Sequence, residues 1–176
     1  AAAGGDTVLV IDISSPASPS QSGSYVHNLN INEMKVYGDY LYCADSNGYM
    51  VLSISDPDNP AFSNRFTDPD FTEEILSMQI TGNLLLFCEY YGDFKVHDIS
   101  NPAAPVKLCE GDNLDMQVLT LYGDILFFQC DDSVNPKLYS AQIFNPFFDT
   151  INNIGQSTVV PTIPSDIYRY RISTPG

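Results

Sequence analysis

The sequence DISNPAAP, from Asp98 to Pro105, occurs in three other versions along this chain. The other copies are DISSPASP (Asp12–Pro19), SISDPDNP (Ser53–Pro60) and, less closely, QIFNPFFD (Gln142–Asp149). In the three clear copies, two prolines fix φ and remove two N–H donors, so the phrase cannot lie inside a hydrogen-bonded ladder. The repeated phrase therefore predicts a repeated corner between two β-strands.

A second phrase recurs with a similar period. It reads YGDYLYCAD (Tyr37–Asp45), TGNLLLFCE (Thr81–Glu89) and YGDILFFQCD (Tyr122–Asp131). Its turn positions Asp39, Asn83 and Asp124 are 44 and 41 residues apart, and a weaker fourth copy surrounds Asp166. Glycine accepts a positive φ without a Cβ clash, so Gly-Asp and Gly-Asn between apolar runs predict tight hairpins. The chain therefore consists of four similar units.

Each unit is expected to form four short strands. Inner segments such as TVLVIDI and YMVLSI are apolar at successive positions, which is typical of strands that are covered on both faces. Units of this length with four strands are typical of β-propeller blades. We therefore expect an all-β fold, a single β-propeller domain over residues 1–176 with four blades of four antiparallel strands. The repeat units are approximately 33–72, 73–114, 115–157, and 158–176 together with 1–32.

The phase of the repeats predicts how the ring closes. The chain begins in a third and a fourth strand, and it ends in a first strand, QSTVVPTI, and a second strand, SDIYRYRI. Pairing the N- and C-terminal strands in one last blade would remove two exposed sheet edges. The alternatives are a fragment of a larger propeller and an arc that another chain completes.

Charge and composition exclude several classes of partner. The chain has 22 acidic and 7 basic residues, and its formal net charge is −15. Such a surface repels nucleic acid and anionic lipid headgroups, and it favours cations and basic partners. We expect no membrane span, because no apolar run approaches the length of about 20 residues that a spanning helix needs. The four cysteines show no metal-ligand spacing, so we expect buried free thiols, with one disulfide as the alternative.

These motifs resemble those of a known family. MKVYGDYLYCADSNGYMVLSISDPDNPAFSNRF (Met34–Phe66) closely resembles an LVIVD repeat, and VLVIDISSPASP and FKVHDISNPAAP resemble its second half. The chain departs from the motif where Ser53 and Gln142 replace its Asp. The resemblance implies a β-propeller that is exported, extracellular or attached to the cell surface. It implies no particular activity and no catalytic residue.

One acidic run is a candidate metal site. TDPDFTEE (Thr67–Glu74) holds the carboxylates of Asp68, Asp70, Glu73 and Glu74. Ca²⁺ takes six to eight oxygen ligands, and these side chains could supply part of that set. The spacing is not that of an EF-hand loop. A solvated acidic loop is the alternative.

Aromatic side chains lie among the acids on the same predicted loop face. The candidate surface for a ligand or partner consists of Phe71, Tyr90, Tyr91, Asp93, Asp131 and Asp132. Acidic and aromatic groups together suit sugars, cationic peptides or basic protein patches.

Enzymatic motifs are weak. The two histidines, His27 and His97, have no Ser or Cys nucleophile in a recognisable motif. We therefore expect a non-enzymatic exported or cell-surface propeller that acts as a binding or assembly module through its loop faces. Its partner would be a protein, a second copy or a glycan. The alternatives are a Ca²⁺-stabilised carbohydrate-binding propeller and a metal-assisted hydrolase at the channel mouth.

Overall fold

A computed structural model of the chain describes residues 2–4, 7–67, 74–90, 94–111, 116–123, 125–130, 137–144 and 169–173. The regular secondary structure in these ranges consists of β-strands alone, which confirms the all-β expectation. The first sheet holds β1 (Ala2–Gly4), β2 (Thr7–Asp12) and β3 (Ser20–Val26), and the second holds β4 (Ile31–Tyr37), β5 (Tyr40–Asp45), β6 (Gly48–Ser53) and β7 (Ala61–Phe66). The third holds β8 (Ile75–Thr81), β9 (Leu84–Glu89), β10 (Phe94–Asp98) and β11 (Val106–Gly111), and the fourth holds β12 (Met116–Tyr122), β13 (Ile125–Cys130), β14 (Lys137–Phe144) and β15 (Arg169–Ser173).

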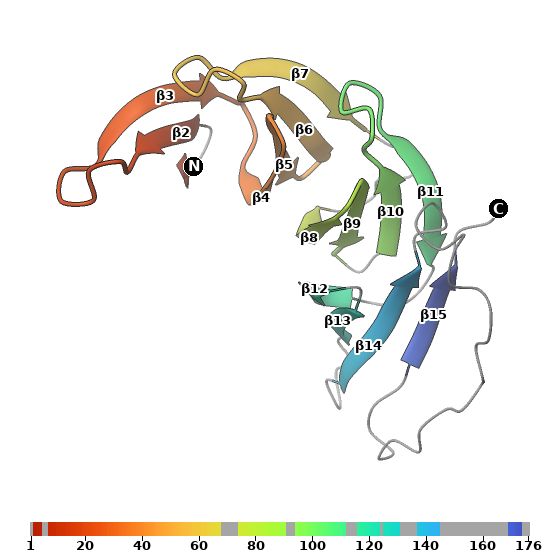
Figure 1. Cartoon of the computed structure of the whole chain (residues 1–176). Coiled ribbons are helices and arrows are strands. Elements are labelled where there is room, and N and C mark those ends of the chain that lie inside the picture. The colour runs from red at the N-terminus through yellow and green to blue at the C-terminus, as the bar shows by residue number, and fades with distance from the viewer. Residues whose placement is uncertain are drawn as a thin grey trace.

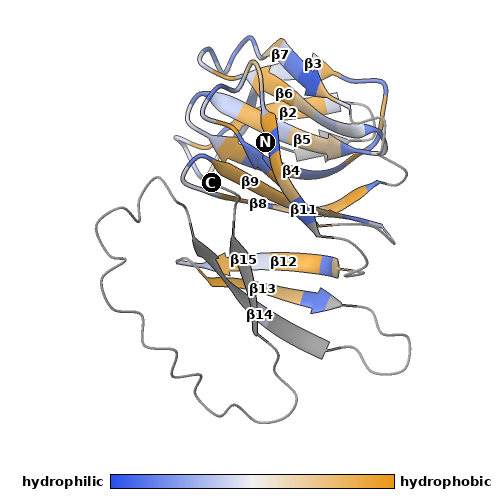
Figure 2. Ribbon diagram, turned by 90° about the vertical axis from the view of Figure 1, so that its right-hand side faces the viewer, coloured by the Kyte–Doolittle hydropathy of each residue, from blue (hydrophilic) through white to orange (hydrophobic). Residues whose placement is uncertain are grey.

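The four sheets follow one another along an arc (Figure 1). The first strands β4, β8 and β12 lie on the inner side of the arc, and β3, β7 and β11 lie on its outer side. The second and third sheets each contain four antiparallel strands in chain order, as the repeat predicts. Hydrophobic residues run along the strands, and hydrophilic residues occur at many of the connecting loops (Figure 2).

The hairpin turns predicted in the three clear copies are confirmed, whereas the weaker copy around Asp166 lies outside the described residues. Gly38, Gly82 and Gly123 have positive φ values of 56°, 54° and 62°. The strand register, in which Tyr37 pairs with Tyr40 and Thr81 with Leu84, leaves two residues in each of the first two turns. A side chain with a Cβ rarely adopts this backbone conformation, which is why glycine recurs there.

The corner phrase folds through its own side chains. Asp12 accepts hydrogen bonds from the backbone N–H of Ser14 at 2.8 Å and from its hydroxyl at 3.1 Å. Asp98 accepts the same backbone bond from Ser100 at 2.8 Å. In the second copy, Ser53 and Ser55 occupy the positions of the Asp and the Ser. Their hydroxyl oxygens lie 3.1 Å apart. The three clear copies thus form the predicted corner after each third strand, whereas residues 145–149 of the fourth copy lie outside the described residues.

The second and third corners each contact the last strand of the preceding sheet. Gly23 of β3 lies so close to the second corner that a Cβ built on it would be 2.3 Å from the carbonyl oxygen of Pro57. The equivalent residue of β7 is Asn64, because Gly23 and Asn64 each pair with the valine two positions before a corner phrase. The Asn64 side chain donates to the carbonyl of Ala103 in the third corner at 2.9 Å. The corner is therefore also a contact between sheets.

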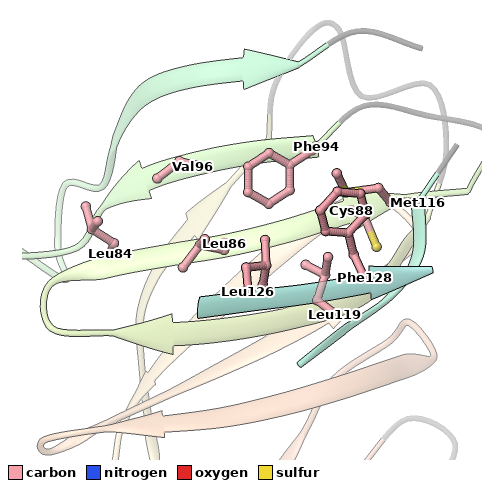
Figure 3. Packing of buried hydrophobic residues seen from close by; sticks show 9 residues of the cluster. All are labelled: Leu84, Leu86, Cys88, Phe94, Val96, Met116, Leu119, Leu126 and Phe128. Atoms are coloured by element: carbon pink, nitrogen blue, oxygen red, sulfur yellow. The ribbon is translucent and has the colours of Figure 1, made fainter. Parts of the chain in front are cut away.

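The hydrophobic core is divided among the interfaces between consecutive sheets. One cluster joins Val8 of the first sheet to Leu41, Cys43, Met50 and Leu52 of the second. A second cluster joins the second and third sheets, and a third joins the third and fourth. In the last of these, Leu86 and Phe94 lie with Leu126 and Phe128 across the interface (Figure 3).

Side chains also bond to the backbone of the next inner strand. The carboxylate of Glu33 on β4 accepts from the backbone N–H of Met78 on β8. Ser77 on β8 accepts from the backbone N–H of Leu119 on β12 at 3.3 Å. Glu33 and Ser77 are equivalent, since each stands five residues before its turn glycine. The first strands have no sheet partner on that side, so these bonds satisfy backbone donors at the inner edges.

The predicted closing blade is not confirmed. Arg169–Ser173 forms β15, which pairs in parallel with β14 rather than with the first sheet. The first sheet begins with β1, which pairs antiparallel with β2, so the chain does not begin in a third strand as its repeat phase predicts. Three residues are too short to show a repeat pattern, and β1 occupies the position beside β2 that the closing strand would need. The first and fourth sheets lie at opposite ends of the arc (Figure 1).

We expect the change Gly23→Ala to lower the free energy of unfolding by about 1–3 kcal/mol, which is typical of overpacking. The added Cβ would meet backbone oxygens of the second corner, which cannot rotate away. Urea unfolding measures the effect, and Ser24→Ala, at an exposed neighbour on the same strand, is the control. Equal stability of the two variants would contradict the close approach.

Candidate functional site

The candidate metal site lies mostly outside the described residues. Of its four acids, only Glu74 is described, and it is exposed. Its carboxylate accepts from the Asn32 side chain at 3.1 Å. Among the described residues, no group of three His, Cys, Asp or Glu side chains is placed to hold a metal ion. The proposed ligands Asp68, Asp70 and Glu73 are not described, so the metal site stays a prediction.

The candidate partner surface has the same limit. Phe71, Tyr91, Asp93, Asp131 and Asp132 lie outside the described residues. Tyr90 is described, and its backbone N–H donates to the carbonyl of Glu74 at 2.9 Å. This backbone bond continues the pairing of β8 with β9, so the candidate partner surface stays a prediction.

Asp45 and Glu89, at the ends of the second strands of two sheets, form ion pairs. Asp45 is fully buried and receives two bonds from Arg65, at 2.8 and 2.6 Å. It also contacts His27 at 3.0 Å and accepts the backbone N–H of Asn47 at 2.8 Å. Asp45 links two sheets, because His27 follows β3 whereas Arg65 lies on β7.

Glu89 stands at the equivalent position of the third sheet and is paired differently. Its carboxylate contacts the ammonium of Lys95 on β10 at 2.8 Å, and the two side chains are only 2% and 1% exposed. Charges this deeply buried must be paired, because desolvation strongly disfavours a lone charge. Asp45 and Glu89 are therefore held within the fold by their cationic partners.

His97 is a core residue. Its Nδ1 lies 2.9 Å from the hydroxyl of Tyr49. Its ring forms T-shaped contacts with the rings of Phe66 and Phe87, at centroid distances of 4.4 and 4.8 Å. His97 is thus a structural residue of the interface between the second and third sheets. Burial also raises the pKa of the Tyr49 hydroxyl, with a smaller contribution from Tyr42.

Three cysteines, Cys43, Cys88 and Cys109, are free thiols. Cys43 and Cys88 are buried, and Cys109 is partly buried, which agrees with the expectation from sequence. Burial, followed by the charge of Asp45, raises the pKa of the Cys43 thiol to about 12. The thiolate is the reactive form of cysteine, so Cys43 is chemically inert at neutral pH.

A groove of about 360 Å³ lies between the first two corners. Carboxylates and exposed apolar groups line it together. The lining residues are Val10, Ile11, Asp12, Ile13, Ser14, Ser22, Pro57 and Asp58. Ile13 is 70% exposed, which is high for an isoleucine inside a repeat motif. The hydrogen bonds from the backbone and then the side chain of Ser14 hold the pKa of Asp12 below its ordinary value, so this carboxyl is charged at neutral pH.

Sequence reasoning treated the corner phrase only as a connection between strands and so missed this corner groove. Asp12 does serve the corner, because it bonds Ser14, but a space also opens beside it between adjacent corners. The corner groove depends on Gly23, which lets the second corner approach β3. A glycine inside a fourth strand, together with an isoleucine inside the corner phrase, was the available signal.

Comparison with known proteins identifies the family. The LVIVD repeat matches residues 2–27, 31–68 and 80–109, more than half of the chain. The chain belongs to the LVIVD repeat family. These LVIVD matches cover the first and second sheets and most of the third. The described residues contain no helix that could span a membrane. No curated protein shows significant similarity to the sequence.

We expect Glu89→Gln to cost about 3–5 kcal/mol of unfolding free energy, because the buried ammonium of Lys95 loses the charge of the Glu89 carboxylate. The double variant Glu89→Gln/Lys95→Met should recover most of that loss. Methionine already occupies the equivalent position of the second sheet, Met50. Chemical denaturation of the two variants measures both values. A double variant no more stable than the single one would contradict charge pairing as the cause.

Proposed function

We propose that this LVIVD chain is a non-enzymatic binding module, exported or attached to the cell surface, that holds a protein partner through its loop faces. The observation that carries the proposal is the corner groove, in which exposed Ile13 lies with the carboxylates of Asp12 and Asp58. The proposed location follows the LVIVD resemblance.

The groove chemistry favours a basic peptide segment with an aliphatic side chain. Two carboxylates offer partners for Lys or Arg, and Ile13 and Pro57 offer apolar contact to an aliphatic group. The net charge of −15 attracts basic partners over longer range. A partner segment that carries Lys or Arg beside an aliphatic side chain would match this combination of groups.

Several polar groups that could serve catalysis are already engaged in the fold. His27 contacts Asp45, and His97 contacts Tyr49 across a sheet interface. Glu89 is paired with Lys95. These engagements support a binding role over a hydrolytic one.

We expect a peptide of alternating Lys and Leu to bind the chain and to bind less tightly as salt is added, because salt screens exposed charges. The change Asp58→Asn should weaken binding by about 1.5- to 5-fold, the range for one exposed ion pair. Isothermal titration calorimetry measures both effects. Asp39→Asn, which removes the same charge from an exposed turn outside the corner groove, is the matched control. Equal losses in the two variants, or no binding, would contradict the proposal.

A Ca²⁺-stabilised carbohydrate-binding propeller is a second proposal. It is favoured by the bond between Tyr90 and Glu74, which brings an aromatic residue next to a proposed metal ligand. The remaining ligands would be Asp68, Asp70 and Glu73, and sugars would contact Phe71 and Tyr91.

If Ca²⁺ binds there, a concentration about a hundredfold above its Kd should stabilise the native state by about 2.7 kcal/mol. For a chain of this size that corresponds to a rise in melting temperature of about 5–11 °C over the value in EDTA. A thermal melt followed by circular dichroism measures the difference. The variant Glu74→Gln should reduce the rise, and an unchanged melting temperature in Ca²⁺ would rule out this site.

A further inference from the structure

The outward face of the fourth sheet exposes apolar side chains. Val118, Tyr122 and Ile125 are 54%, 79% and 36% exposed. The residue equivalent to Ile125 in the third sheet is Leu84, since each stands two residues after its turn glycine, and Leu84 is only 2% exposed. Leu84 is buried because the fourth sheet covers it, and among the described residues no further sheet covers the face of Ile125.

The outward face of the first sheet exposes apolar side chains at the other end of the arc. Leu9 and Ile11 are half-buried, and Ile13 is 70% exposed. Their equivalents in the second sheet include Met50 and Leu52, which are 1% and 0% exposed, because the first sheet covers them. The equivalent of Ile13 in the third sheet, Ile99, is fully buried against the second sheet.

The two end faces therefore correspond to the two halves of one interface. Every interface inside the arc joins the later face of one sheet to the earlier face of the next. The fourth sheet presents a later face and the first sheet presents an earlier face, at opposite ends of the arc (Figure 1). Repeat arrays that expose such end faces need a cover, which dedicated polar capping repeats supply in other proteins.

We propose that the later face of the fourth sheet docks on the earlier face of the first sheet in a second copy of this chain. The contact is head-to-tail, and it continues the series of sheet interfaces from one chain into the next. A head-to-tail contact closes a ring where the rotation allows and otherwise extends the array. Ile11 and Ile13 belong both to the earlier face of the first sheet and to the corner groove, so a docked copy and a bound peptide would share these two side chains. Closure within one chain, the four-bladed ring expected from the sequence, is the competing arrangement.

The dependence on salt distinguishes this self-association from peptide binding. Two chains of net charge −15 repel each other, and their docking surfaces are apolar. Added salt screens the repulsion, so self-association should strengthen as ionic strength rises. Binding of a basic peptide to the corner groove should weaken under the same change.

The test is sedimentation equilibrium of the whole chain at several protein concentrations and salt levels. The wild-type chain should have a mass of at least two chains at high concentration. Val118→Asp should convert it to a monomer, because it places a charge on the docking face. Val106→Asp is the matched control, since Val106 is 57% exposed but lies on the outer strand β11 of an interior sheet. Circular dichroism shows whether each variant is folded.

A mixing experiment tests the head-to-tail geometry. Leu9→Asp blocks the earlier face and leaves the residues that line the corner groove unchanged. Each blocked variant alone should be a monomer, and an equal mixture of Val118→Asp and Leu9→Asp should form a species of two chains through the one remaining pair of intact faces. A monomeric wild type, a dimer that Val118→Asp leaves intact, or a mixture that stays monomeric would overturn the proposal.

Discussion

Burial of both faces of each interior sheet is the constraint on which this structure depends. Neighbouring residues of a strand point to opposite faces, and in β5 both Leu41 and Tyr42 are buried, at 2% and 0% exposure. A single four-stranded sheet cannot cover such a strand, so the sheets occur in series and each supplies the cover for the next. The second and third corners, the contact between His27 and Asp45 and the bonds between inner strands lie where these sheets meet.

The charged groups show how much the repeats can differ within this constraint. Asp45 and Glu89 occupy equivalent positions, but one pairs with Arg65 on a fourth strand and the other with Lys95 on a third strand. The third equivalent position is Cys130, which carries no carboxylate. What the fold requires is a neutral or paired group at this position. Acidic residues at the ends of second strands are therefore weak indicators of chemistry, and the corner groove is better suited to binding because Ile13 and Asp58 remain exposed there.

Local chemistry made much of the fold predictable. Glycine at positive φ marks the hairpins, and proline after a short polar residue marks the corners, so the period of the strands follows from the sequence. The parallel pairing of β15 with β14 has no local signature, and β1 is too short to show one. The corner groove and the contact between His27 and Asp45 depend on how two sheets approach each other, and spacing within one repeat does not encode that distance. Most of the acidic and aromatic site predicted from composition, including Asp68 and Asp70, lies outside the described residues.

The division of the core into clusters that each join consecutive sheets has a consequence for how the chain folds. None of the three clusters requires segments from distant parts of the sequence to meet. Folding of such arrays is governed by nearest-neighbour contacts, and short-range contacts form faster than long-range ones. The second and third sheets, which share the cluster around Tyr42 and Phe87, contain the strands with most burial and can form a nucleus. Structure then spreads toward both ends of the chain, and the outer sheets are the last to form and the first to open.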